Sequence, residues 1–209
     1  MKPIIFKHIL LASFLTTSTL AIAQSENYVA HITSLNSSKT GYNPSGTATF
    51  KIKGNNLVIH VKMDGTPPNI QHWEHFHGFP DGAEAQCPTA ANDSNGDGFV
   101  DLMETGQSMG TTMVPFNDKP EVMNIPTDTY PKANAKGSYE YTKIVPLTTL
   151  QAKFGKTYEG QQIDLDKRVF MVHGVPTSLT LPDSVGGQVG SYGTHVTLPI
   201  ACGKIEKVK

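Results

Sequence analysis

The sequence is short of positive charge. Arg168 is the only arginine among 209 residues, and the formal net charge at pH 7 is −1. Proteins that bind nucleic acid use clustered lysine and arginine side chains to neutralise phosphates. We therefore expect no nucleic-acid partner and no phosphate-recognition site.

Long apolar runs are also scarce. Residues 9–20 form one that is too short to span a membrane comfortably; two lysines precede it and Ala-Ile-Ala follows it at 21–23. This arrangement predicts a signal peptide over residues 1–23, and hence an exported protein, periplasmic or secreted. No later segment suggests a transmembrane helix, and we expect residues 24–209 to form a single domain.

Only two cysteines are present, Cys87 and Cys202. In an exported chain an even pair favours one disulfide bond, which here would close a loop of more than a hundred residues. The alternative left open by the sequence is a pair of thiolate metal ligands.

Alternation of apolar and polar residues predicts many short β-strands. Residues 47–53 and 57–63 alternate on either side of Gly-Asn-Asn, which is typical of a β-hairpin. Other strands are expected at 28–35, 111–116, 138–145, 168–173 and 195–205, with long loops between them and one short helix at 147–154. This pattern favours an all-β sandwich or barrel.

Three histidines are concentrated in residues 70–78. His75 and His77 lie two positions apart, so on a straight strand they share a face and can bind one metal ion together. His72 falls on the opposite face and is not expected to join them. Imidazole groups suit copper or zinc.

An acidic stretch follows at residues 93–104. Its spacing matches that of an EF-hand loop, with Gly98 at the position of the sharp turn. The expected calcium ligands are Asp93, Asn95, Asp97, Phe99 through its carbonyl, Asp101 and Glu104. No clear helix is predicted on either side, so we expect a lone calcium loop and not a paired EF-hand; the alternative is a solvated acidic turn.

Several motifs together resemble those of Cu,Zn superoxide dismutases. They are His72-x-x-His75-x-His77, the segment from Arg168 to His173, and Ala-Cys-Gly-Lys-Ile at 201–205. The resemblance implies a Greek-key antiparallel β-sandwich, copper ligation by His75, His77 and His173, and a disulfide between Cys87 and Cys202. The chain also resembles exported bacterial proteins of the CHRD type, which share an H-x-H-G segment and an Asp-rich loop.

The resemblance is incomplete. The family's copper–zinc bridging histidine would follow Cys87, but the next histidine is His173. The family's active-site arginine corresponds to Pro199, which removes a charge that attracts and orients superoxide. His195 could supply a fourth ligand or a hydrogen bond to one; its alternative role is that of a surface histidine.

These observations lead to two hypotheses. The first is an exported metal-binding protein with a calcium loop and a copper-type histidine site, acting in metal storage, delivery or interaction. The second is a copper-dependent, dismutase-like redox enzyme. Both make metal ions the expected partners: calcium at the acidic loop, and copper, with zinc as an alternative, at the histidines.

Overall fold

A computed structural model of the chain describes residues 25–209, so the predicted signal peptide at 1–23 lies outside the described part. The strands are β1 (Glu26–Ser34), β2 (Ser45–Lys53), β3 (Asn56–Asp64), β4 (Glu74–Gly78), β5 (Thr111–Pro115), β6 (Tyr139–Pro146), β7 (Val169–His173) and β8 (Pro199–Lys207). The helices are α1 (Ser37–Thr40), α2 (Leu102–Met109), α3 (Leu147–Thr157) and α4 (Thr194–Thr197), with short 3-10 turns at Ala90–Asn92, Pro120–Val122 and Leu165–Lys167. Within residues 25–209, every helix is too short or too polar to cross a membrane.

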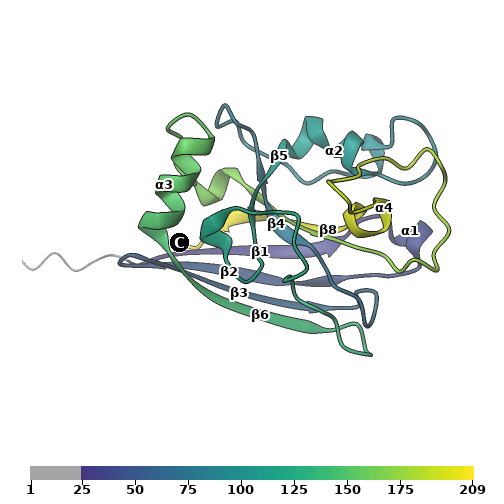
Figure 1. Cartoon of the computed structure of the whole chain (residues 1–209), viewed down its shortest axis with the longest axis horizontal. Helices are drawn as coiled ribbons and strands as arrows, with labels where there is room; N and C mark the ends of the chain where they lie inside the picture. Colours follow the sequence, from purple (N-terminus) through teal and green to yellow (C-terminus); the bar gives the residue numbers. More distant parts are fainter. Residues whose placement is uncertain (1–24) are drawn as a thin grey trace, which may run out of the picture.

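The eight strands form one antiparallel sheet in the order β5-β4-β7-β8-β1-β2-β3-β6. Strand β8 pairs with β7 over residues 199–204 and with β1 over residues 201–207, and thereby joins two portions of the sheet. The sheet curves around the core, with β1, β2, β3 and β6 in one layer and β4 and β5 above it (Figure 1). The all-β prediction is confirmed.

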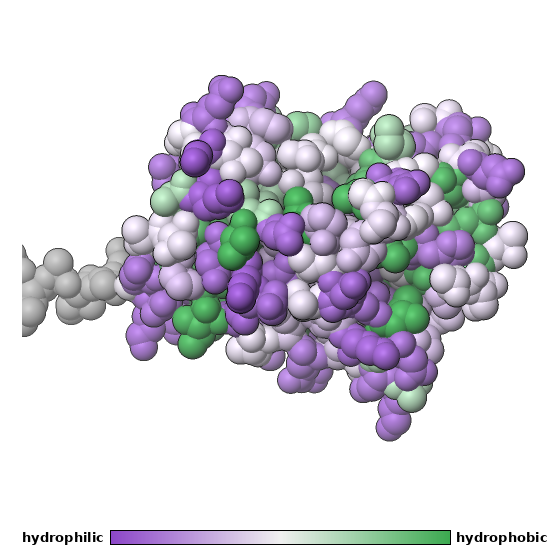
Figure 2. Space-filling model, viewed as in Figure 1, coloured by the Kyte–Doolittle hydropathy of each residue, from purple (hydrophilic) through white to green (hydrophobic). Residues whose placement is uncertain are grey.

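The predicted hairpin is present and forms one wall of the core. Strands β2 and β3 pair in register from Ser45 opposite Asp64 to Lys53 opposite Asn56. The apolar residues of the pattern, such as Phe50 and Ile59, are fully buried, whereas the polar residues that alternate with them face outward. On the face shown in Figure 2 hydrophilic residues predominate and hydrophobic ones are scattered among them.

Four phenylalanines connect the two layers of the core. Phe50 of β2 lies with its ring centroid 5.1 Å from that of Phe76 in β4 and 5.8 Å from that of Phe116. Phe170 of β7 completes the cluster at 5.4 Å from Phe116. Because β4 and β7 also carry the histidines of interest, this cluster supports the strands from behind.

The helix predicted at 147–154 is present as α3, but it is not the only one in the described residues, and α2 is the longest of those not predicted. This helix begins directly after the acidic loop, because the Asp101 side chain accepts hydrogen bonds from the backbone N–H groups of Met103 and Glu104, and Glu104 accepts one from Asp101 N–H. Such a capping box can outweigh the cost of about 1 kcal/mol for Gly106 inside the helix.

The predicted last strand begins later than expected. Residues around His195 form the short helix α4, and β8 starts only at Pro199. The backbone N–H of Leu198 bonds to the carbonyl of Thr194, so this segment satisfies its polar groups locally before it joins the sheet.

The predicted disulfide bond between Cys87 and Cys202 is present. It ties the loop after β4 to strand β8, and Cys202 lies opposite Met171 of β7 in the sheet. The thiolate-ligand alternative is therefore excluded while this bond is intact.

Candidate metal centre

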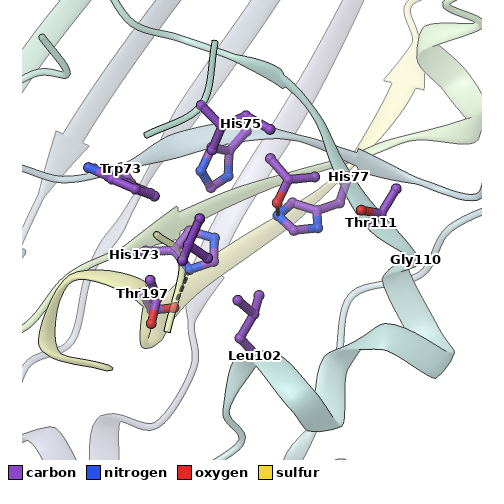
Figure 3. A pocket seen from close by; sticks show the side chains of 11 residues that line it. Trp73, His75, His77, Leu102, Gly110, Thr111, His173 and Thr197 are labelled. Atoms are coloured by element: carbon purple, nitrogen blue, oxygen red, sulfur yellow. Dashed lines mark hydrogen bonds between the residues drawn. The ribbon is translucent and has the colours of Figure 1, made fainter. Parts of the chain in front are cut away.

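Two adjacent strands bring three histidines together. His75 and His77 point to the same side of β4, as the period of two requires. Strand β7 pairs antiparallel with β4, with Met171 opposite His75, and ends at His173. One ring nitrogen from each histidine lies within 4.8 Å of those of the other two, and their rings face one another (Figure 3).

The three imidazoles are buried, yet most of their ring nitrogens have no hydrogen-bond partner in the described protein. The exposed fractions of His75, His77 and His173 are 2%, 0% and 1%. Both ring nitrogens of His75, Nδ1 of His77 and Nε2 of His173 are unpartnered. A buried polar atom without a partner costs roughly 1 to 3 kcal/mol, so four of them in one place indicate a site built for a ligand.

Neighbouring groups orient two of the rings. His173 Nδ1 donates to the carbonyl of Thr197 over 2.7 Å, which leaves Nε2 as the nitrogen with a free lone pair. His77 Nε2 lies 3.2 Å from the hydroxyl of Thr112, and its free nitrogen is Nδ1. A bond at one imidazole nitrogen that fixes the other for coordination is the usual arrangement at metal-binding histidines.

The same burial keeps the histidines uncharged. Loss of hydration lowers the pKa of His75 and His77 well below the ordinary value, and the neighbouring His173 lowers both further. The pKa of His173 is lowered to about 4, again by burial. The rings are therefore neutral at pH 7, which is the form that binds metal ions.

A pocket of about 340 Å³ opens in front of the three histidines. His75, His77 and His173 lie at its buried end together with Trp73. Leu102 from the start of α2 reaches into this region, and Thr197 from α4 lies beside His173 (Figure 3). The three histidines thus line a pocket, while their unpartnered ring nitrogens themselves are buried.

His72 and His195 do not belong to the histidine group. His72 faces away, as predicted, and its two ring nitrogens lie 3.0 and 2.9 Å from the carbonyls of His173 and Pro67. His195 Nε2 lies 2.8 Å from the carbonyl of Leu179. The structure therefore places the His195 side chain apart from the site expected to use it as a ligand.

The acidic loop adopts a closed conformation. Glu104 accepts hydrogen bonds from the backbone N–H groups of Ser94 and Asn95, so the last expected ligand closes back on the start of the loop. Asp93 accepts from the N–H groups of Gly96 and Gly98.

The remaining expected calcium ligands are also placed by the loop. Asn95 accepts from Asp97 N–H, Asp97 from Phe99 N–H and from the hydroxyl of Ser184, and Asp101 caps α2. The carboxylates of the described chain do not converge as the three histidines do. The described geometry is thus that of a hydrogen-bonded loop.

The only arginine lies away from the pocket. Arg168 is buried, donates to the carbonyls of Ile163 and Gln162, and packs 5.5 Å from the ring centre of Phe154. Pro199, at the position of the expected family arginine, is a buried residue of β8. Among the residues of 25–209 that line the pocket, none is charged.

Sequence reasoning missed most of the residues that surround the histidines. Trp73 lies next to the histidine motif and could have been included, because a single tryptophan beside candidate ligands is a local signal. Ile125 and Val189 come from irregular segments, and no periodic pattern in the sequence identifies them.

Comparison with known proteins gives a limited result. No family model and no curated protein matches the chain, so the resemblance to CHRD and EF-hand proteins gains no support there. Among solved structures, the chain is similar to "Cu/Zn superoxide dismutase from Brucella abortus", at 18% identity and a TM-score of 0.42 over 87% of this chain and 100% of that one. It is also similar to a point mutant of a "SOD-like protein from Bacillus subtilis", at 12% identity and a TM-score of 0.43 over 84% of this chain and 95% of that one.

Proposed function

We propose that this protein is an exported metal-binding protein that holds one copper-type ion at His75, His77 and His173. The observation that carries the proposal is the set of four buried ring nitrogens without hydrogen-bond partners, contributed by three neutral imidazoles. In this role the protein stores or delivers the metal, or serves as an interaction module that requires it.

The donor set favours copper or zinc over harder metals. It consists of imidazole nitrogens, which suit both ions, whereas magnesium, calcium and manganese prefer oxygen ligands. Both cysteines are used in the disulfide bond and add no thiolate. Copper(II) binds nitrogen sites more tightly than zinc in the general order of divalent metals, so we favour copper.

Metal analysis of the purified protein tests the proposal. We expect about one copper per chain, and loss of that copper in the double variant His75→Ala/His77→Ala. His60→Ala is the matched control, because His60 is exposed on β3 and bonds to Thr142. Equal copper content in the wild type and the double variant would place the metal elsewhere and reject the site.

A copper-dependent redox enzyme of the dismutase type is the alternative. The pocket favours it, because three protein ligands beside an open space leave a coordination position for a substrate. Copper would then supply the change between its two oxidation states. The lack of charge in the described pocket lining argues against it, since superoxide is an anion that such enzymes attract electrostatically.

Superoxide consumption distinguishes these two functions. The copper-loaded protein should consume superoxide no faster than the same amount of free copper if it is a storage or delivery protein. A fast reaction that disappears in His75→Ala/His77→Ala and persists in His60→Ala would establish the enzyme instead.

We further propose that the loop at residues 93–104 binds one calcium ion. Its ligand spacing supports this, and Glu104 lies against Ser94 and Asn95 at the start of the loop, so the residue that would close an EF-hand site as a bidentate ligand is near the other expected ligands. Calcium should raise the melting temperature of the wild type but not of Asp93→Asn/Glu104→Gln. An equal rise in both proteins would contradict a calcium site here.

Export is part of the same proposal. The predicted signal peptide and the disulfide bond support it, because disulfides persist in oxidising compartments. Sequencing the N-terminus of the protein recovered from periplasm and from culture medium tests it. We expect the chain to begin at Gln24 in one of these fractions; an intact Met1 would contradict processing.

A further inference from the structure

A series of aromatic rings leads from the histidine site toward the surface. Trp73 lies two residues before His75, and its ring centre is 6.2 Å from that of His75 (Figure 3). Tyr192, in the loop before α4, meets Trp73 edge-on with 4.7 Å between the ring centres. Trp73 is 2% exposed, whereas Tyr192 is only partly buried. The three rings therefore connect the buried site with the solvent.

Two of these rings can carry an electron. Indole and phenol rings give up a single electron more readily than other aromatic side chains, and electrons pass rapidly between such rings when they are in contact. The phenylalanine cluster behind β4 and β7 offers no such route, because a benzene ring is far harder to oxidise. An electron supplied to the histidine site through aromatic rings therefore comes from the side of Trp73.

The proton acceptors of these rings set the direction of transfer. An oxidised phenol is strongly acidic, so it persists only when its proton can leave. The hydroxyl of Tyr192 donates to Oδ1 of Asp128 over 3.0 Å, so a carboxylate is in place to take that proton. Tyr130 also stacks on Trp73, but its hydroxyl donates to the carbonyl of Ile125, which is a far weaker base.

Trp73 itself is suited to pass the electron on. Its Nε1 has no hydrogen-bond partner in the described protein and is buried. An oxidised Trp73 would therefore keep its positive charge in a place without solvent, which is unfavourable. An electron from Tyr192 removes that charge.

We infer that Trp73 and Tyr192 form a one-electron relay between the histidine site and the surface, with Asp128 as the proton acceptor. One electron moves from Tyr192 to oxidised Trp73, and the phenolic proton moves from Tyr192 to Asp128. Trp73 is restored and Tyr192 becomes a neutral radical, so no net charge stays buried.

The role of the relay in the metal-bound protein rests on the site proposed above. A copper ion held there supplies an oxidant when it meets hydrogen peroxide, because peroxide needs two electrons and two protons to form two waters and a cuprous ion gives only one electron. The relay supplies the second electron, and solvent supplies the protons. A thiol or enediol in solution then returns one electron to Tyr192 and releases its own proton to solvent, while Asp128 returns the phenolic proton. The relay thereby protects His75 and its neighbours from oxidation.

The metal-free protein tests the relay without any metal. A laser pulse at the long-wavelength edge of protein absorption excites tryptophan in preference to tyrosine, and Trp73 is the only tryptophan of the chain. The pulse ejects one electron from Trp73, and nitrous oxide with tert-butanol removes this electron and the hydroxyl radical formed from it. Transient absorption then follows the tryptophanyl and tyrosyl radicals, which absorb in separate bands.

We expect the tryptophanyl signal to decay as the tyrosyl signal rises, at a rate that does not depend on protein concentration. Tyr192→Phe should lower the tyrosyl yield at least five-fold. Tyr130→Phe is the matched control, because it changes the other tyrosine on Trp73 and should leave the yield unchanged. Asp128→Asn keeps both rings but removes the base, so it should slow the transfer at least five-fold.

Four results would overturn the inference: no tyrosyl signal in the wild type, an equal yield in the wild type and Tyr192→Phe, loss of the yield in Tyr130→Phe instead, or an unchanged rate in Asp128→Asn. Each of them is read from protein that contains no metal, so none depends on the proposed metal site.

The copper-loaded protein tests the link to the histidines. After copper per chain has been counted, ascorbate and hydrogen peroxide are added, and peptide mass spectrometry measures oxidised His75 and His77. We expect at least three-fold more oxidation in Tyr192→Phe than in Tyr130→Phe, because the oxidant then lacks its source of electrons. Equal oxidation would show that the relay does not serve the site. A copper count near zero would instead reject the metal site, and the photolysis of the metal-free protein would still decide on the relay.

Discussion

Replacing Glu74 by glutamine should change how the stability of the protein depends on pH. Glu74 is fully buried in β4, and its Oε2 accepts a hydrogen bond of 2.8 Å from the hydroxyl of Tyr139. Its Oε1 has no partner in the described chain. Burial raises the pKa of Glu74 to about 8, and the bond from Tyr139 lowers it only in part.

The direction of the effect follows from the two states of the chain. In the unfolded chain the carboxyl group has a pKa of 4.5, so above this pH the unfolded state loses a proton that the folded state keeps. The contribution of Glu74 to stability is therefore full below pH 4.5 and is lost as the pH rises through about 8. Between about pH 6.5 and 8 the loss is roughly 2 kcal/mol, at 1.36 kcal/mol per pH unit.

Urea unfolding of the metal-free protein at these two pH values measures this loss. Glutamine preserves an acceptor for Tyr139 but cannot ionise, so Glu74→Gln should lose roughly 2 kcal/mol less than the wild type between about pH 6.5 and 8. Tyr139→Phe is the matched control: it should lower stability at both pH values and keep the fall. The same pH dependence in the wild type and Glu74→Gln would refute the reasoning.

Three further predictions concern stability. Cys87→Ser/Cys202→Ser should lower the free energy of unfolding by about 4 to 5 kcal/mol, because the disulfide closes a loop with a sequence separation of 115 residues. A loss below about 2 kcal/mol in urea unfolding would contradict this prediction. Acid should destabilise the metal-free protein, because burial lowers the pKa of His173 from 6.5 to about 4. The contribution of neutral His173 to the free energy of unfolding is full above pH 6.5. It is lost as the pH falls to about 4, by roughly 3 kcal/mol. A melting temperature that is constant over this range would contradict that prediction. Asn36→Ala should lower the melting temperature, because it removes three hydrogen bonds to backbone atoms and leaves a left-handed backbone with φ of 61°. Asn36→Gly keeps that conformation accessible, so a loss equal to that of Asn36→Ala assigns the effect to the hydrogen bonds alone.

Regular strands were predictable because side-chain alternation is a local property. The pattern of residues 47–63 specifies which face of the hairpin is buried, and Phe50 and Ile59 are indeed in the core. The same period placed His75 and His77 on one face and His72 on the other. Each of these predictions needs only neighbouring residues.

The third histidine of the site was predictable only through the family resemblance. Nothing local to His173 indicates that β7 pairs with β4, because strand pairing between distant segments depends on the whole fold. The helix α2 was missed for another reason. Gly106 argues against a helix, and the capping box formed by Asp101 and Glu104 decides in its favour.

The walls of the pocket could not be predicted at all. Ile125 and Val189 lie in loops whose paths are set by hydrogen bonds such as that between Tyr130 and the carbonyl of Ile125. Such contacts carry no period in the sequence. A pocket built from several loops therefore becomes visible only in the folded molecule.

The pairing of β4 with β7 bears on whether the histidine site needs a metal ion in order to fold. The strands that carry the histidines are joined by backbone pairing and are backed by the phenylalanine cluster. Small zinc domains differ, because their metal supplies the folding energy. For the metal site proposed above we therefore expect that a chelator yields an empty but intact protein that can be reloaded.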